Sequence, residues 1–128
     1  MSKTLTLVLA AAASLTALGV QAADRKDVAA AFGNTVLSTY PDGRQQKIWM
    51  KPDGSWDGLS RRGTPLAGKW SLKDEKVCLR QSKPPTLPVA YCTPFPDQAA
   101  VGVVWTGKDM SGTPITLKLV KGMPKTGS

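Results

Sequence analysis

The sequence predicts a mainly β protein, in which about eight antiparallel strands form a meander that closes into an up-and-down barrel or a strongly curved sheet. From Thr35 onward, apolar and polar residues alternate with a period of two, as they do along half-buried strands. Tight-turn residues interrupt this alternation at short intervals, with Pro-Asp-Gly at 41–43 and again at 52–54. Eight strands joined by short loops are enough to close a barrel, and the alternative is a two-sheet β-sandwich.

The first 22 residues are expected to be a signal peptide. Lys3 gives a positive start, an apolar run follows over 5–18, and Val20-Gln21-Ala22 presents small or apolar residues where a signal peptidase reads. The run is shorter than the roughly 20 residues that a membrane-spanning helix needs. Cleavage after Ala22 would deliver the chain to the periplasm or outside the cell, with no transmembrane span in the mature chain. A single β domain is then expected over 23–121 and a flexible tail over 122–128.

The segment 24–32 is the one helix candidate of the mature chain. Asp24 can cap it, and Asp27 lies in the first turn, where the helix dipole favours an acid. Val28 and Phe32 fall on one face, so we expect this short N-terminal helix to pack against the sheet through them and to cover one end of it.

The strands are expected in order at 35–40, 44–51, 55–61, 66–73, 76–82, 89–93, 99–106 and 113–120. The stretch 49–70 holds three of the four tryptophans and should form the middle of the meander. Gly58 interrupts the third strand and predicts a β-bulge there. The segment 99–106 is the most apolar and is expected to be a central strand, whereas KPPTLP at 83–88 is too rich in proline for a strand and should be a stiff loop.

Cys78 and Cys92 are expected to form a structural disulfide. Two cysteines in an exported chain usually pair, because the compartment is oxidising. Closing the loop between them contributes about 3 kcal/mol in the chain-entropy model. A redox pair would favour Cys-x-x-Cys spacing, and a zinc site would need more Cys or His ligands than a chain without histidine supplies.

The stretch from Asp53 to Phe95 contains DGSWDG, GKWSLKDEKVCL and YCTPF, with Gly68, Trp70, Cys78, Leu79 and Cys92 as its anchors. In these residues it resembles small exported proteobacterial proteins of unknown function. The resemblance implies a lipocalin-like β fold and export to the periplasm. It implies no activity and no catalytic residues.

The composition argues against an enzyme. Without histidine, the chain cannot form a Ser-His-Asp triad or a Cys-His pair. Nearly all of its nine acidic residues fall at expected turns or at the helix start, where bonding to the local backbone accounts for them. We therefore predict no catalytic residue, no metal site and no cofactor.

The formal charge of +8, or +7 once Lys3 leaves with the signal peptide, favours acidic partners. These are anionic lipid, lipopolysaccharide, an acidic polymer or a protein partner. The charges are dispersed along the chain, which argues against a dedicated nucleic-acid surface.

Two groups of residues are candidates for ligand binding. Trp49 shares a strand face with Lys47 and Lys51, and an exposed indole between lysines could contact a sugar, a base or a lipid headgroup. The alternative is that Trp49 belongs to the core. Arg61 and Arg62 could bind an anion bidentately, or they could simply form a solvated hairpin end.

Three functions fit these features. The first is a non-enzymatic binding module of the periplasm or cell envelope for an anionic or amphipathic ligand. The second is a secreted inhibitor of a protease or other hydrolase, which would present the loop at 83–88 as a rigid element. The third is an envelope scaffold protein without a small ligand.

Overall fold

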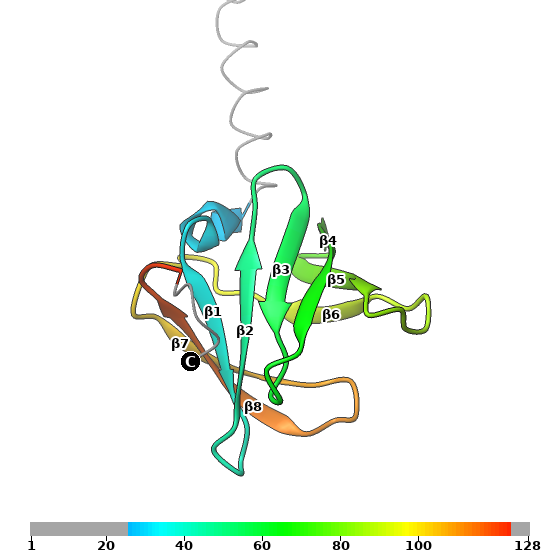
Figure 1. Cartoon of the computed structure of the whole chain (residues 1–128). Helices are drawn as coiled ribbons and strands as arrows, with labels where there is room; N and C mark the ends of the chain where they lie inside the picture. Colours follow the sequence, from blue (N-terminus) through cyan, green and yellow to red (C-terminus); the bar gives the residue numbers. More distant parts are fainter. Residues whose placement is uncertain (1–25, 124–128) are drawn as a thin grey trace, which may run out of the picture.

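The computed structural model describes residues 26–123, which form one eight-stranded antiparallel sheet preceded by a short 3-10 helix (Figure 1). The helix is η2 (Lys26–Ala31), and the strands are β1 (Thr35–Thr39), β2 (Gln45–Met50), β3 (Ser55–Leu59), β4 (Pro65–Lys73), β5 (Lys76–Lys83), β6 (Tyr91–Pro94), β7 (Val104–Lys108) and β8 (Pro114–Val120). The predicted signal peptide lies outside the described residues, as does the predicted tail beyond Met123.

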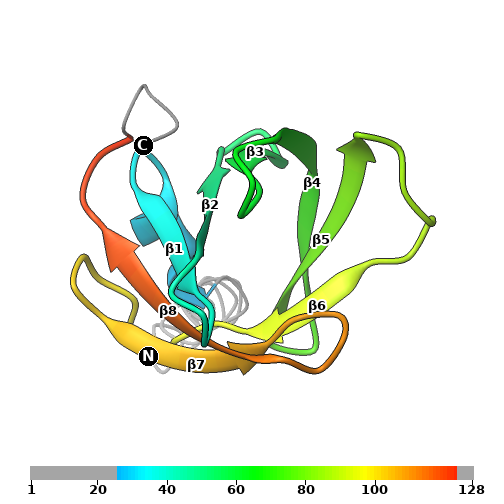
Figure 2. The same cartoon turned by 60° about the horizontal axis from the view of Figure 1, so that its bottom comes forward.

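The strands follow the order β6-β5-β4-β3-β2-β1-β8-β7. β1 pairs with both β2 and β8, so the unpaired edges of the sheet are β6 and β7. Figure 2 shows the sheet curving round until these two edges lie side by side, which gives a nearly closed barrel. The predicted eight-stranded, strongly curved meander is confirmed, and the strands form one sheet rather than the two of a sandwich.

Aspartates set the geometry of several hairpin turns. The Asp42 carboxylate accepts a hydrogen bond from the Arg44 N–H, and the Asp53 carboxylate accepts one from the Ser55 N–H, each at 2.9 Å. Gly43 and Gly54 follow these aspartates with φ of 86° and 90°, the conformation that glycine adopts without a steric cost. The two Pro-Asp-Gly sequences are therefore the turns that the sequence predicted.

The tryptophans of β3 and β4 tie the middle of the sheet together. Trp70 Nε1 donates to the Lys51 carbonyl at 2.8 Å, and Trp56 Nε1 donates to the Lys69 carbonyl at 3.1 Å. The bulge of this region lies between Ala67 and Gly68, where the register of β4 and β5 shifts. The predicted bulge at Gly58 is wrong, because Gly58 pairs in regular register with both neighbouring strands.

The predicted helix is shorter and tighter than expected. Only Lys26–Ala31 is helical among the described residues, and its geometry is 3-10, as is common for single short turns. Val28 and Ala31 are buried in the core, and the Phe32 ring packs on Trp70 with 5.9 Å between centroids. The segment thus covers one end of the barrel, as Figure 1 shows.

The expectation of a central apolar strand at 99–106 is wrong. The chain turns at 100–103, where the Val103 N–H donates to the Ala100 carbonyl, and β7 begins only at Val104. β7 is an edge strand, and the side chains of Val101 and Val104 are 50% and 56% exposed. The apolar composition of this run predicted a central strand, but two of its three valines are exposed.

Cys78 and Cys92 form the predicted disulfide. They lie directly opposite each other on β5 and β6, with 4.0 Å between their Cα atoms. At the other end of the chain, the Gly122 N–H donates to Asn34 Oδ1 and its carbonyl accepts a hydrogen bond from Thr35 Oγ1. Gly122, where the tail was expected to begin, is therefore bonded to the start of β1.

Replacing Glu75 with glycine is expected to stabilise the protein. Asp74 and Glu75 connect β4 to β5 with φ of 50° and 63°, as in the two-residue turn that Asn-Gly normally forms. The left-handed conformation costs a side-chain-bearing residue about 1 kcal/mol, so thermal unfolding followed by circular dichroism should show a melting temperature several degrees higher. The control Lys73→Gly, at a regular strand position, should lower it, and an unchanged melting temperature for Glu75→Gly would contradict the proposed strain.

Candidate functional site

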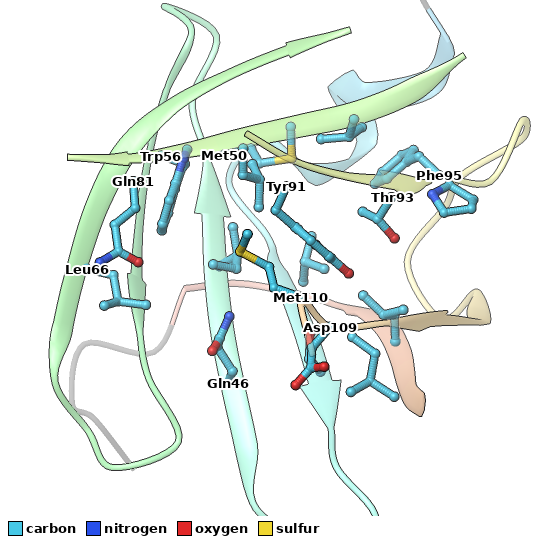
Figure 3. A pocket seen from close by; sticks show the side chains of 18 of the residues that line it. Gln46, Met50, Trp56, Leu66, Gln81, Tyr91, Thr93, Phe95, Asp109 and Met110 are labelled. Carbon is cyan, nitrogen blue, oxygen red and sulfur yellow. The ribbon is translucent and has the colours of Figure 1, made fainter. Parts of the chain in front are cut away.

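The concave face of the sheet encloses a cavity of about 470 Å³. One end is covered by the core beneath η2, and the cavity opens at the other end, between the loops that follow β1, β3, β5 and β7. Figure 3 shows side chains from opposite walls pointing into it. Its volume is in the range of sites that bind small molecules.

The strand period decides which side chains line the cavity. Ser38 and Tyr40 point inward from β1 and its following turn, while their neighbours point outward. On β2 and β5 the inward side chains change from apolar near η2 to polar near the opening, where Gln46 and Gln81 lie. The apolar base comprises Ile48, Met50, Trp56, Val77, Phe95 and Leu117, all buried. The cavity is therefore apolar at depth and polar at its mouth.

Three side chains from three loops or strand ends meet at the mouth. The Arg61 guanidinium stacks on the Tyr40 ring, 3.8 Å from its centroid, and the Tyr40 hydroxyl interacts with the Asp109 carboxylate. Stacking holds Arg61 by its face, which leaves the N–H groups at its edge directed away from the ring. The arrangement places a cationic donor fork beside the opening of an apolar cavity.

The electrostatics of this cluster keep Asp109 charged and Tyr40 protonated at neutral pH. Burial and the nearby Asp109 carboxylate raise the pKa of Tyr40, against the opposing effect of Arg61. Burial also acts to raise the pKa of Asp109, but hydrogen bonds from Ser111, Thr113 and Tyr40 outweigh it and hold that pKa below its usual value.

Polar groups also gather where β6 faces β7. The Tyr91 hydroxyl donates to the Lys108 carbonyl, and the Phe95 and Trp105 rings meet edge to face with 5.4 Å between centroids. Among the described residues, Thr93 Oγ1 and Trp105 Nε1 are buried without a hydrogen-bond partner. A buried polar group without a hydrogen bond costs free energy. Thr93 and Trp105 both line the cavity, so each of these two groups is available to bind a polar atom of a ligand.

Lys47, Trp49 and Lys51 lie on the outer wall of the barrel and not in the cavity, because they alternate with the inward-facing Ile48 and Met50. Trp49 is half-buried, and its Nε1 donates to Thr35 Oγ1 at 2.8 Å. Lys51 forms an ion pair with Asp57 at 2.5 Å, and the hydrogen bond to Asp57 raises the pKa of Lys51. Trp49 and Lys51 thus have local structural partners, and the binding role of all three residues stays a prediction.

Arg61 and Arg62 are exposed in the turn after β3, at the mouth of the cavity. The structure therefore places them apart from the other candidate group, Lys47, Trp49 and Lys51, which lies on the outer wall. Sequence reasoning did not identify Tyr40, Gln46, Gln81 and Asp109 as mouth residues. The available signal was a polar residue at the end of an apolar stripe, as in Gln46-x-Ile48-x-Met50.

Within residues 26–123, no three His, Cys, Asp or Glu side chains are arranged to hold a metal ion. Over the same range, no helix has the length and apolar character required to cross a membrane. Comparison of the chain with protein-family models, with curated proteins and with solved structures found no match.

Proposed function

We propose that this protein is a non-enzymatic binding protein of the periplasm or cell envelope, which holds one small, anionic, amphipathic molecule inside its barrel. The observation that carries the proposal is the 470 Å³ cavity, apolar at its base and polar at its mouth. Such a gradient fits a ligand with an apolar body and a charged head. The Cys78–Cys92 disulfide is compatible with an exported protein.

The apolar base would supply most of the binding free energy. Each CH₂ group transferred from water to this region contributes about 0.8 kcal/mol. Because Trp56, Met50 and Leu117 are already buried and in contact with the core, the wall does not need to be ordered when a ligand enters. A preformed cavity of this kind favours tight binding of a single chain or ring system.

The residues at the mouth would select a ligand whose head group is negatively charged. Arg61 presents a donor fork beside the opening, and Gln46 and Gln81 offer neutral donors on the adjacent walls. Asp109 already accepts hydrogen bonds from Ser111 and Thr113 of its own turn, so its charge is partly compensated. A carboxylate or phosphate head beside Arg61 is the arrangement that these groups favour.

The loop 84–90 has a place in this function. Thr86, Leu87 and Val89 line the cavity, so the segment 83–88 that was predicted from sequence as an inhibitory loop contributes Thr86 and Leu87 to the proposed binding site. Inhibition of a hydrolase and a scaffold role remain predictions that a different assay would test. No catalytic step is proposed, since the chain lacks histidine and both cysteines are bonded to each other.

The fluorescent fatty acid cis-parinaric acid is expected to bind saturably, and filling the cavity should abolish this binding. Ser38 is buried on the inward face of β1, so Ser38→Phe should place a ring in the cavity and weaken binding at least about tenfold. Thr39→Phe adds the same ring on the outer face of the same strand and should bind like the wild type. A fluorescence titration measures both affinities.

The charge preference is read from the same titration. Binding of the acid should weaken as salt is raised, while binding of its neutral methyl ester should not. If neither probe binds at low salt, or if Ser38→Phe binds as tightly as Thr39→Phe, the cavity is not the site.

A further inference from the structure

Four loops surround the mouth of the cavity, at 40–44, 60–64, 84–90 and 109–113, and Figure 2 looks toward this end of the barrel. Three exposed apolar side chains lie on two of these loops, whereas Val101, Val104 and Met123 are exposed at the covered end. Leu87 is 74% exposed, Met110 68% and Val89 50%. The strands that lead into these loops are linked by the hydrogen bond from the Tyr91 hydroxyl to the Lys108 carbonyl, which keeps the two loops together. The mouth therefore carries an apolar rim on one side.

Basic residues surround this apolar rim. The four loops and the strand ends beside them carry Arg44, Arg61, Arg62, Lys83 and Lys108, against two acidic residues, Asp42 and Asp109. Both acids have local partners. Asp42 forms an ion pair with Arg44, with 3.5 Å between Oδ2 and Nε, and Asp109 accepts hydrogen bonds from Ser111 and Thr113. The excess positive charge at this end is consequently available to an external anion.

The opposite end of the barrel lacks this excess of positive charge. There the connection between β4 and β5 carries Lys73 and Lys76 beside Asp74 and Glu75, and the turn after β2 carries Lys51 beside Asp53. Charges of both signs thus alternate at the covered end, whereas the open end combines apolar loop tips with a net positive charge. This combination is typical of proteins that bind the surface of an anionic bilayer.

We propose that the open end docks on an anionic lipid bilayer, with the tips of loops 84–90 and 109–113 inserted among the headgroups and the basic residues contacting lipid phosphates. Leu87 and Met110 would enter the interface, and Arg61 and Arg62 would lie at headgroup level. Docking in this orientation faces the cavity mouth toward the lipid, so an amphipathic molecule could pass between bilayer and barrel without crossing bulk water. The docking surface does not require an occupied cavity.

The test is co-sedimentation of the full chain with vesicles of equal parts phosphatidylglycerol and phosphatidylcholine, compared with vesicles of phosphatidylcholine alone. At low ionic strength the wild type should bind only the anionic vesicles. Arg61→Glu combined with Arg62→Glu should weaken this binding by roughly thirtyfold or more. The matched control, Lys73→Glu combined with Lys76→Glu, makes the same charge change at the covered end and should bind like the wild type.

The apolar contribution needs its own pair of variants. Leu87→Ser combined with Met110→Ser should weaken vesicle binding at least about tenfold. Val101→Ser combined with Val104→Ser removes two apolar side chains, each at least half exposed, away from the mouth and should leave binding unchanged. Ser38→Phe, which blocks the cavity, should also bind vesicles normally, so a failure of the cavity and a failure of docking give different results.

Three outcomes would overturn the proposal. The first is equal binding to both kinds of vesicle, and the second is an equal loss of binding when the covered end is changed. The third is no vesicle binding at low salt, in which case the rim would fit a protein partner instead.

Discussion

Replacing Gly68 with alanine is expected to destabilise the protein by about 3 kcal/mol or more, a large effect for the addition of one methyl group. A Cβ atom at this position would overlap the Arg80 carbonyl oxygen and would lie 2.8 Å from Trp56 Nε1. Neither neighbour can easily move. Arg80 is part of the β5 backbone at the bulge, and the Trp56 indole is held by its hydrogen bond to the Lys69 carbonyl.

Urea unfolding followed by tryptophan fluorescence would measure this loss. The control is Lys69→Ala, the next residue along β4, whose side chain is exposed and whose substitution should change the free energy of unfolding by no more than about 0.5 kcal/mol. A Gly68→Ala variant as stable as that control would mean that β4 and β5 can separate at the bulge, and that the contact with Arg80 does not constrain the sheet.

Replacing both Cys78 and Cys92 with alanine is expected to lower the free energy of unfolding by about 3 kcal/mol, because the unfolded chain regains the freedom of the loop that the disulfide closes. In a domain of this size the melting temperature should fall by roughly 10–25 °C. β6 should be affected most. It is only four residues long, it pairs with β5 alone, and its other edge faces β7 without a hydrogen-bonded ladder.

Thermal unfolding with and without a reducing agent gives the comparison. The reduced wild type and the double alanine variant should melt at similar temperatures, well below the oxidised wild type. Ser71→Ala, which lies beside Cys78 on β4, is the matched control and should be close to neutral. A double variant that melts with the oxidised wild type would show that the disulfide adds nothing to stability.

The hairpins could be predicted from sequence because their signals are local. Asp42-Gly43 and Asp53-Gly54 fix a turn through the aspartate side chain and the positive φ of glycine, whatever the rest of the chain does. The position of β7 could not be predicted in this way. An apolar run such as 99–106 indicates burial, but whether it is central or at an edge depends on which strand lies beside it, and that depends on long-range pairing.

In the candidate site, too, local features could be predicted from the sequence, whereas features that depend on long-range pairing could not. The period of two correctly predicts that Lys47, Trp49 and Lys51 share a face, but it does not say which face of the sheet is concave. Curvature accumulates from the twist and the pairing of all eight strands, so the inward position of Ile48 and the outward position of Trp49 appear only in three dimensions. Likewise, Tyr40, Arg61 and Asp109 are far apart in sequence and meet because three hairpins end at one rim.

The pairing of β1 with β8 also relates the strand order of this sheet to that of a plain meander, in which each strand pairs with the next one along the chain. Thr35 lies opposite Val120, so β1 and β8, the first and last strands of the described sheet, are neighbours. If they were joined and the chain were cut before β7, the strands would follow one another around the sheet in the order in which they occur along the new chain. Topologically, the described sheet is therefore a circular permutation of a plain eight-stranded meander. The two unpaired edges, β6 and β7, would be the last and first strands of the permuted chain.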